Sequence, residues 1–278
     1  MKVLVTGANG YIGRHVVSSL LDKGCSVVAC DIVIDNVDSR AERITVDLFS
    51  GDYEGLMSKL GNPDVCLHMA WRNGFVHNAT SHIGDLSSHY NFLVALIQQG
   101  LKHIAVMGSM HEVGYWEGII DETTPCNPMS QYAIAKNALR QSLELYCKAG
   151  EVVFQWLRGF YIVGDDLKNH SIFSKICQAA QEGKTTFPFT SGKTKYDFID
   201  IDVLANQIAS VVCQQKINGI INCCSGIPVS LAERVEQFIS DHGFNIKLEY
   251  GAFPDRPYDS PIIYGDNSKI QAILNAHK

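Results

Sequence analysis

Tyr132 and Lys136 are the residues of this sequence best suited to acid–base chemistry on a substrate. They lie four residues apart in the segment YAIAK, which is about one helical turn, so we expect both side chains on one face of a helix. An ordinary phenol titrates near pH ~10, and a neighbouring ammonium favours its charged form. The pair therefore predicts a tyrosine that moves a proton and a lysine that stabilises its phenolate.

Ser109 is a second hydroxyl with a position suited to this chemistry. It follows a predicted strand at residues 103–107, and ligands bind at the carboxyl ends of strands in open α/β sheets. There it can polarise a substrate carbonyl and hydrogen-bond to Tyr132. The alternative is a serine that only caps a helix or a turn.

A glycine-rich turn near the amino terminus predicts a dinucleotide site. In TGANGYIG, Gly7, Gly10 and Gly13 stand three residues apart, between a strand at residues 3–5 and a helical pattern at residues 11–23. Such a turn lets the first N–H groups of the helix approach a pyrophosphate. The expected cofactor contacts in this turn are Gly7, Asn9, Gly10, Tyr11, Ile12 and Gly13.

Asp31 ends the second predicted strand, where an acid can bind the adenosine ribose hydroxyls. A 2′-phosphate would meet like charge there, so Asp31 favours NAD(H) over NADP(H), although Arg40 is close enough for a loop to bring it in. Asp47, with Leu48 beside it, ends the third strand and is expected near the adenine.

Strands and helices alternate along the first part of the chain, which predicts the scaffold that positions these residues. The fold expected is α/β, a Rossmann-like doubly wound parallel sheet with a smaller C-terminal substrate-binding lobe. Residues 1–164 would form mainly the dinucleotide domain, and residues 165–278 mainly the substrate lobe, with returns of the chain to the first domain. Residues 250–266 contain three of the eight prolines and are expected to be irregular.

Composition excludes several other classes of protein. Of 278 residues, 46% are apolar, which is typical of a globular protein. The formal net charge is −6, which argues against the basic surface that binds nucleic acid. The absence of a leader or an apolar span of about 18 residues predicts a cytoplasmic protein with no membrane contact. The nine cysteines include no CxxC pair, so no metal site is expected.

Together, these motifs resemble the extended short-chain dehydrogenase/reductase family, in particular its nucleotide-sugar epimerases, dehydratases and 4-ketoreductases. The resemblance spans essentially the whole chain and includes HMA at residues 68–70, LRGFYIVG at 157–164, YDFIDID at 196–202 and Arg256-Pro257. It implies NAD(P), a nucleoside-diphosphate sugar as substrate, and a homodimer formed through the Tyr132 helix and the helix at residues 87–99.

The resemblance also implies roles for individual residues. Ser109, Tyr132 and Lys136 would carry the chemistry, with Lys136 also holding the nicotinamide ribose, and Arg256 would pair with the substrate diphosphate. Further cofactor contacts are expected at Asp31, Asp47, Leu48, Met69, Ala70, Met107, Tyr132, Lys136, Tyr161 and Val163. Further substrate contacts are expected at Trp71, Arg72, Ser109, Met110 and His111.

The residues after Ser109 narrow the reaction. Family dehydratases have an Asp-Glu pair where this chain has Met110 and His111, and a methionine cannot protonate a leaving hydroxyl. A 4-ketoreductase of a 4-keto-6-deoxyhexose is favoured, a 4-epimerase is the alternative, and a non-catalytic NAD-binding scaffold is a third reading. His111, which ordinarily titrates near neutrality, is expected to exchange protons with the substrate, with His170 as a partner, or only to hydrogen-bond in the loop. His77 and His82 would line the sugar pocket or lie at the surface.

Overall fold

The apolar strand β1 (Lys2–Thr6) is an interior strand of the larger sheet, and its side chains are buried on both faces. Val3 and Val5 pack into one core and Leu4 into the other. The computed structural model describes residues 1–164, 171–255 and 259–276. In spatial order the strands are β11 (Gly219–Cys223), β7 (Val153–Gly159), β5 (His103–Ser109), β4 (Val65–His68), β1, β2 (Ser26–Asp31) and β3 (Glu42–Thr45).

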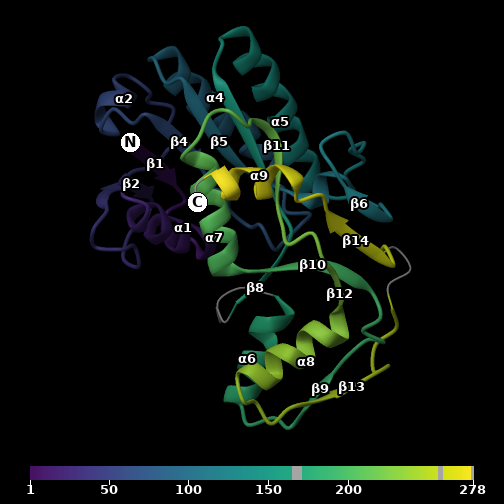
Figure 1. Ribbon diagram of the computed structural model, residues 1–278. Helices are drawn as coiled ribbons and strands as arrows, with labels where there is room; N and C mark the ends of the chain where they lie inside the picture. Colours follow the sequence, from purple (N-terminus) through teal and green to yellow (C-terminus); the bar gives the residue numbers. More distant parts are fainter. Residues whose placement is uncertain (165–170, 256–258, 277–278) are drawn as a thin grey trace.

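All neighbouring strands of this sheet are parallel, and helices cover both of its faces (Figure 1). One face carries α1 (Tyr11–Asp22), α7 (Ile201–Val212) and α9 (Ser268–Ala276). The other carries α2 (Leu56–Lys59), α4 (Leu86–Gln98) and α5 (Gln131–Ala149). The predicted doubly wound Rossmann-like fold is confirmed.

A smaller lobe with its own apolar core lies beside the carboxyl edge of the larger sheet (Figure 1). Its sheet has the order β12 (Pro228–Ser230), β10 (Lys195–Asp200), β14 (Ile262–Gly265) and β6 (Gly118–Ile120), and β8 (Tyr161–Val163) also pairs with β10. The remaining elements of the lobe are α6 (Ile172–Gln181), α8 (Leu231–Asp241), β9 (Thr186–Pro188) and β13 (Lys247–Glu249). The chain then returns to the larger sheet, where α9 packs against α7 and β11.

A buried carboxylate, Asp197 of β10, joins three segments of this lobe. Its oxygens accept hydrogen bonds from the backbone N–H groups of Ser225, Gly226 and Gly265, at 2.8–3.1 Å. The expectation that residues 250–266 are irregular is wrong for their last part, because β14 pairs with β10 and β6. These partners are distant in sequence, so local composition could not indicate the strand.

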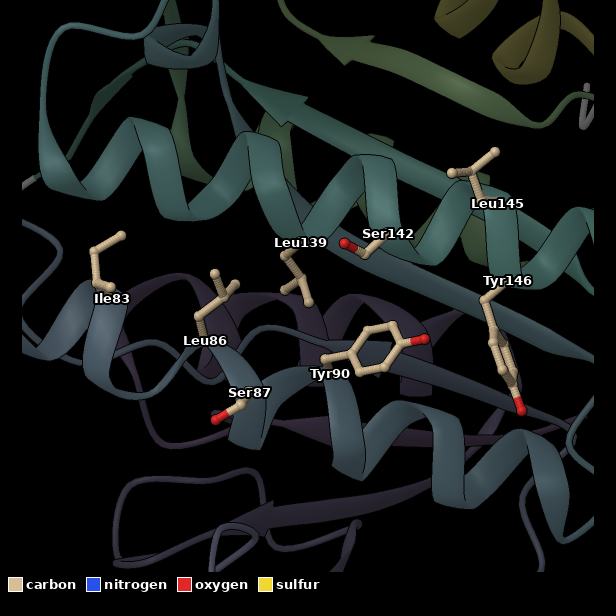
Figure 2. A pocket seen from close by; sticks show the side chains of 8 residues that line it. All are labelled: Ile83, Leu86, Ser87, Tyr90, Leu139, Ser142, Leu145 and Tyr146. Atoms are coloured by element: carbon tan, nitrogen blue, oxygen red, sulfur yellow. The ribbon is translucent and has the colours of Figure 1, made fainter.

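The outer faces of α4 and α5 border an open groove of about 690 Å³. Figure 2 shows Leu86 of α4 and Leu139 of α5 turned toward each other across it. Leu145 is 72% exposed and Ile83, on the short helix α3 (Ser81–Gly84), is 44% exposed. The lining residues are Ile83, Leu86, Ser87, Tyr90, Leu139, Ser142, Leu145 and Tyr146. Across the described ranges, no helix has the length and apolarity needed to cross a membrane.

Candidate active site

The glycine turn between β1 and α1 has a backbone that other residues cannot adopt without displacement. Gly7 has φ +68°, and a Cβ there would lie 2.6 Å from the amide nitrogen of Ala70. A Cβ on Gly13 would overlap the carbonyl oxygen of Gly7. The N-cap of α1 is Gly10, which has no side chain to accept from the first-turn N–H groups, so this helix start is suited to an anion.

Asp31 lies beside this turn, as expected for an acid at the end of β2. Its carboxylate accepts hydrogen bonds from the N–H groups of Asn9 at 3.0 Å and Ile32 at 2.8 Å. Arg40 points elsewhere, because its guanidinium pairs with Asp38 at 2.7 Å and with Asp22 at 2.8 Å. Arg40, the cation considered for a 2′-phosphate, is thus already paired with two carboxylates.

The other two residues expected near the adenine lie just beyond β3. Asp47 accepts a hydrogen bond from the N–H of Phe49 at 3.0 Å, and Leu48 is buried in the core shared with α4. Their contact with a cofactor stays a prediction.

A buried polar chain connects the end of β1 with the end of β4. The N–H groups of Met69 and Ala70 donate to Thr6 Oγ1, which lies 2.8 Å from His68 Nδ1. His68 Nε2 lies 2.8 Å from His89 Nδ1 on α4. Burial lowers the pKa of His68 to about 3 and that of His89 to about 2, so both rings are neutral. The chain places Met69 and Ala70 against the glycine turn.

Ser109 is the last residue of β5 and lies close enough to Tyr132 to affect its pKa. The N–H of His111 donates to Ser109 Oγ at 3.3 Å, which leaves the hydroxyl proton for another acceptor. A hydrogen bond from Ser109 lowers the pKa of Tyr132, but burial has the larger, opposite effect and raises it to about 12. Ser109 therefore lies beside Tyr132, and their shared role in catalysis stays a prediction.

Lys136 makes its hydrogen bond with the backbone and not with the phenol. Its Nζ donates to the carbonyl oxygen of Met107 at 2.7 Å and lies 3.8 Å from the ring centroid of Trp71, compared with 5.9 Å from that of Tyr132. Burial lowers the pKa of Lys136 to about 7. We expected Lys136 to lower the pKa of Tyr132. In this structure the group that lowers it is Ser109, and the larger effect of burial still raises that pKa overall.

Three histidines surround the ring of Tyr132. His77 stacks on it, with centroids 5.7 Å apart at 15°, whereas His82 and His111 approach it edge-on at 5.3 and 6.5 Å. His111 also lies 5.0 Å from His77 and 6.3 Å from Tyr161. Burial lowers the pKa of His111 to about 4, so the expectation that it titrates near neutrality is wrong here.

Three other residues were expected to bind substrate or cofactor. Arg72 has its guanidinium in a bidentate pair with Asp85. Met110 is buried in the core of the smaller lobe, directly after Ser109. Val163 is buried at the end of β8, and a Cβ on the following residue, Gly164, would overlap the Tyr11 hydroxyl oxygen. The end of β8 thus lies against the glycine turn.

Comparison with known proteins identifies the family. Residues 3–224 match the model of the NAD dependent epimerase/dehydratase family. The chain belongs to this family. It is 45% identical, over 95% of its length and 99% of the relative's, to a dTDP-6-deoxy-L-talose 4-dehydrogenase (NAD(+)) of Aggregatibacter actinomycetemcomitans. It is 27% identical to a UDP-arabinose 4-epimerase of Arabidopsis thaliana, over 98% of this chain and 74% of the relative.

Solved structures of similar proteins agree with the fold. A UDP-N-acetylglucosamine 4-epimerase from Methanobrevibacter ruminantium superposes with a TM-score of 0.84 at 21% identity, covering 98% of this chain and 91% of that one. MoeE5 in complex with UDP-glucose and NAD superposes with a TM-score of 0.80 at 23% identity, covering 99% and 92%. At this level of identity the match establishes the architecture.

Within this epimerase/dehydratase site, Glu112 is a buried charge that we did not predict. Its carboxylate accepts from the N–H of Ser109 at 2.7 Å and from Trp156 Nε1 at 2.9 Å, and it lies 3.7 Å from the guanidinium of Arg158. Burial raises the pKa of Glu112, and Arg158 opposes that rise. The sequence signal was the spacing Ser-x-x-Glu at residues 109–112, which is typical of a capping box.

Two residues expected at the site, His170 and Arg256, lie outside the described residues. Ser109, His111, Tyr132, Lys136 and Trp71 come together where the end of β5, the start of α5 and the loop after β4 meet. A buried phenol with a hydroxyl and an ammonium near it can supply a proton to an alkoxide or take one from a hydroxyl.

Proposed function

We propose that this protein is an NAD-dependent sugar-nucleotide 4-ketoreductase, which reduces the 4-keto group of a nucleoside-diphosphate 6-deoxyhexose. The observation that carries the proposal is the meeting of Ser109, Tyr132 and Lys136 beside the glycine turn. The 45% identical relative, named a dTDP-6-deoxy-L-talose 4-dehydrogenase (NAD(+)), supports this chemistry, because oxidation of a 4-hydroxyl and reduction of a 4-ketone are two directions of one reaction.

NAD(H) fits the chain better than NADP(H). The uncapped start of α1 and the backbone of Gly7 and Gly13 would hold the pyrophosphate, and Asp31 the adenosine ribose. Pairing of Arg40 with two acids argues against a 2′-phosphate. When bound, the cofactor supplies the hydride. Tyr161 and Val163, at the edge of the smaller lobe, would close over the nicotinamide.

The proton in this mechanism comes from the phenol. With a pKa raised to about 12, Tyr132 is protonated at neutral pH and can donate to the oxygen at C4 as it gains negative charge. Ser109 would hydrogen-bond to the same oxygen and polarise the carbonyl. Lys136 would stabilise the phenolate left behind, which a buried cation does more strongly than one in water.

The substrate would lie over Met110, His111 and the loop after β4 that contains Trp71 and Arg72, and Arg256 would pair with its diphosphate. His111, kept neutral by burial, would hydrogen-bond to the sugar and not act as a cation. We further propose a homodimer formed through α4 and α5. The apolar groove between these helices and the exposed Leu145 support it, because a second copy would cover both.

A 4-epimerase remains the second candidate, supported by the curated relatives that are named UDP-arabinose 4-epimerases. Both reactions use the same proton and hydride transfer at C4. They differ in whether the cofactor leaves the protein after one transfer or stays and returns the hydride.

One experiment separates these functions. NADH or NADPH is mixed with the purified full chain and a dTDP-4-keto-6-deoxyhexose, and absorbance at 340 nm is followed. We expect consumption of NADH that requires the keto sugar, and a loss of about 10²-fold or more in kcat for Tyr132→Phe. Interconversion of sugar epimers by protein that retains stoichiometric NAD would favour the epimerase. Binding of NAD with no turnover of either substrate class would favour a non-catalytic scaffold.

A further inference from the structure

Trp71, three residues beyond β4, contacts both members of the tyrosine–lysine pair. The Lys136 ammonium nitrogen lies 3.8 Å from the Trp71 ring centroid, and Trp71 and Tyr132 meet edge-on with centroids 6.0 Å apart at 89°. Lys136 is only 3% exposed, and its hydrogen bond goes to the Met107 carbonyl. The indole face is therefore a major partner of a cation that has little contact with water.

Two histidines fix the plane of this indole ring. His89 stacks on it, with centroids 4.3 Å apart at 13°, and Trp71 Nε1 donates to His82 Nδ1 at 3.1 Å. Because His82 Nδ1 accepts, its proton is on Nε2, which donates to the Val76 carbonyl at 3.0 Å. The Trp71 ring is thus held by its stack with His89 and by the hydrogen bond that Nε1, its only donor, makes with His82.

The same stack is connected to the glycine turn. Thr6 Oγ1 accepts from two backbone N–H groups, so its proton is free to go to His68 Nδ1. His68 then donates from Nε2 to His89 Nδ1, which fixes the tautomer of both rings. A continuous series of contacts leads from Thr6 through His68 and His89 to Trp71.

The charged and titratable groups around Lys136 come from four elements. Tyr132 lies on the same helix, Glu112 follows β5, and the neutral rings of His68 and His89 come from β4 and α4. The carboxylate of Glu112 raises the pKa of Lys136 but is itself bound by Trp156 and Arg158. An aromatic face attracts a cation through its quadrupole, and most strongly where water is absent.

We propose that Trp71 is a positioning residue, whose indole face, oriented by His82 and His89, holds the Lys136 ammonium beside the Tyr132 phenol. This role rests on the proposed function, in which Lys136 stabilises the phenolate. It also predicts a property of the cofactor-free protein, namely that the ring favours the protonated form of this buried lysine.

The first test measures Lys136 directly in cofactor-free, full-length protein. Lysine is labelled with ¹³C at Cε, the Lys136 signal is assigned by its absence in Lys136→Arg, and its pKa is read from an NMR titration. Trp71→Phe keeps an aromatic face without the N–H, and Trp71→Leu removes both. We expect the Lys136 pKa to fall by about one unit in Trp71→Leu and by much less in Trp71→Phe.

A second test leaves the size and hydrogen bond of the ring almost unchanged. Replacing all tryptophans by 5-fluorotryptophan weakens the quadrupole of Trp71, and also labels Trp116 and Trp156. We expect a lower Lys136 pKa and an alkaline limb of kcat/KM moved to lower pH in labelled wild type. The same labelling in Trp71→Phe, the matched control, should change neither quantity.

The inference is overturned if Trp71→Leu and Trp71→Phe have the same Lys136 pKa, or if fluorination changes Trp71→Phe as much as wild type. These outcomes are separate from failure of the proposed function. Wild type that shows no turnover of any sugar nucleotide would contradict that function, while the NMR titration would still report on Trp71 and Lys136.

Discussion

At the scale of single residues, the buried carboxylate of Glu112 contacts several groups next to Ser109, the residue proposed to polarise the substrate carbonyl. It accepts from the Ser109 N–H and the Trp156 indole, and two guanidinium groups, of Arg158 and Arg140, lie within 4.0 Å. A Cβ on Gly108 would meet the same carboxylate at 2.8 Å, so the strand end has little freedom. The position of Ser109 thus depends on the buried carboxylate of Glu112.

We predict that Glu112→Gln destabilises the fold by about 3 kcal/mol, because it leaves buried guanidinium charge without its partner. The charge of Glu112 raises the pKa of Tyr132, so its loss lowers that pKa. The pH profile of sugar oxidation, which needs the phenolate, should then move to lower pH. Chemical denaturation and kcat/KM as a function of pH measure both effects. Glu182→Gln, at an exposed ion pair on the smaller lobe, is the control and should change neither.

At the scale of elements, the β1–α1 turn and the end of β4 approach each other backbone to backbone at Gly7 and Ala70. The Gly7 carbonyl and the Ala8 backbone occupy the space that a side chain on Gly13 would need. The backbone of Ala70 occupies the space that a side chain on Gly7 would need. The turn therefore has one arrangement, in which the start of α1 is open to an anion.

We predict that Gly13→Ala weakens NADH binding by about tenfold or more, because the new methyl group displaces the Gly7 carbonyl and with it the turn. Titration calorimetry with NADH measures this. Gly84→Ala is the matched control, since its Cβ would meet nothing within 4 Å. Equal NADH affinity in the two variants would mean that the dinucleotide binds elsewhere.

At the scale of the whole molecule, two neutral histidines in the core make stability depend on pH. Burial lowers the pKa of both His68 and His89 from an ordinary value near 6.5. The unfolded chain therefore binds more protons than the folded chain below that pH, and the folded state loses stability as the pH falls.

We predict that the free energy of unfolding decreases by about 1 kcal/mol for each of these histidines between pH 6.5 and 5.5. Urea denaturation at a series of pH values measures the slope. His89→Gln should have a shallower slope than wild type, because one of the two groups is removed. A slope that is the same in both proteins would mean that other groups cause the acid sensitivity.

The proposed dimer is also a property of the whole molecule. Leu145→Glu places a charge at the groove between α4 and α5, and we expect it to convert a dimer, of about twice 30.7 kDa, to a monomer. Sedimentation velocity measures the mass. Ile227→Glu, at a residue 63% exposed on the smaller lobe, should leave the dimer intact. A monomeric wild type would contradict the proposal.

Several features of the fold and the site could be predicted because their causes are local. The strand–turn–helix around Gly7 to Gly13 and the helical spacing of Tyr132 and Lys136 depend on neighbours within a few residues. Strand β14 and the pairing of Arg72 with Asp85 depend on partners that lie elsewhere in the chain. His82, expected at the sugar pocket or the surface, is buried because Trp71 binds it.

By itself, the sequence determined the fold class, the nucleotide turn and the hydroxyl, phenol and amine of the site, because residue type and short-range spacing specify these. Only the tertiary structure decided the electrostatics. Burial raises the pKa of Tyr132, lowers those of Lys136 and His111, and surrounds the phenol with three histidines. The desolvation of a group depends on which side chains the other elements pack around it, and the spacing of residues along the chain does not specify that packing.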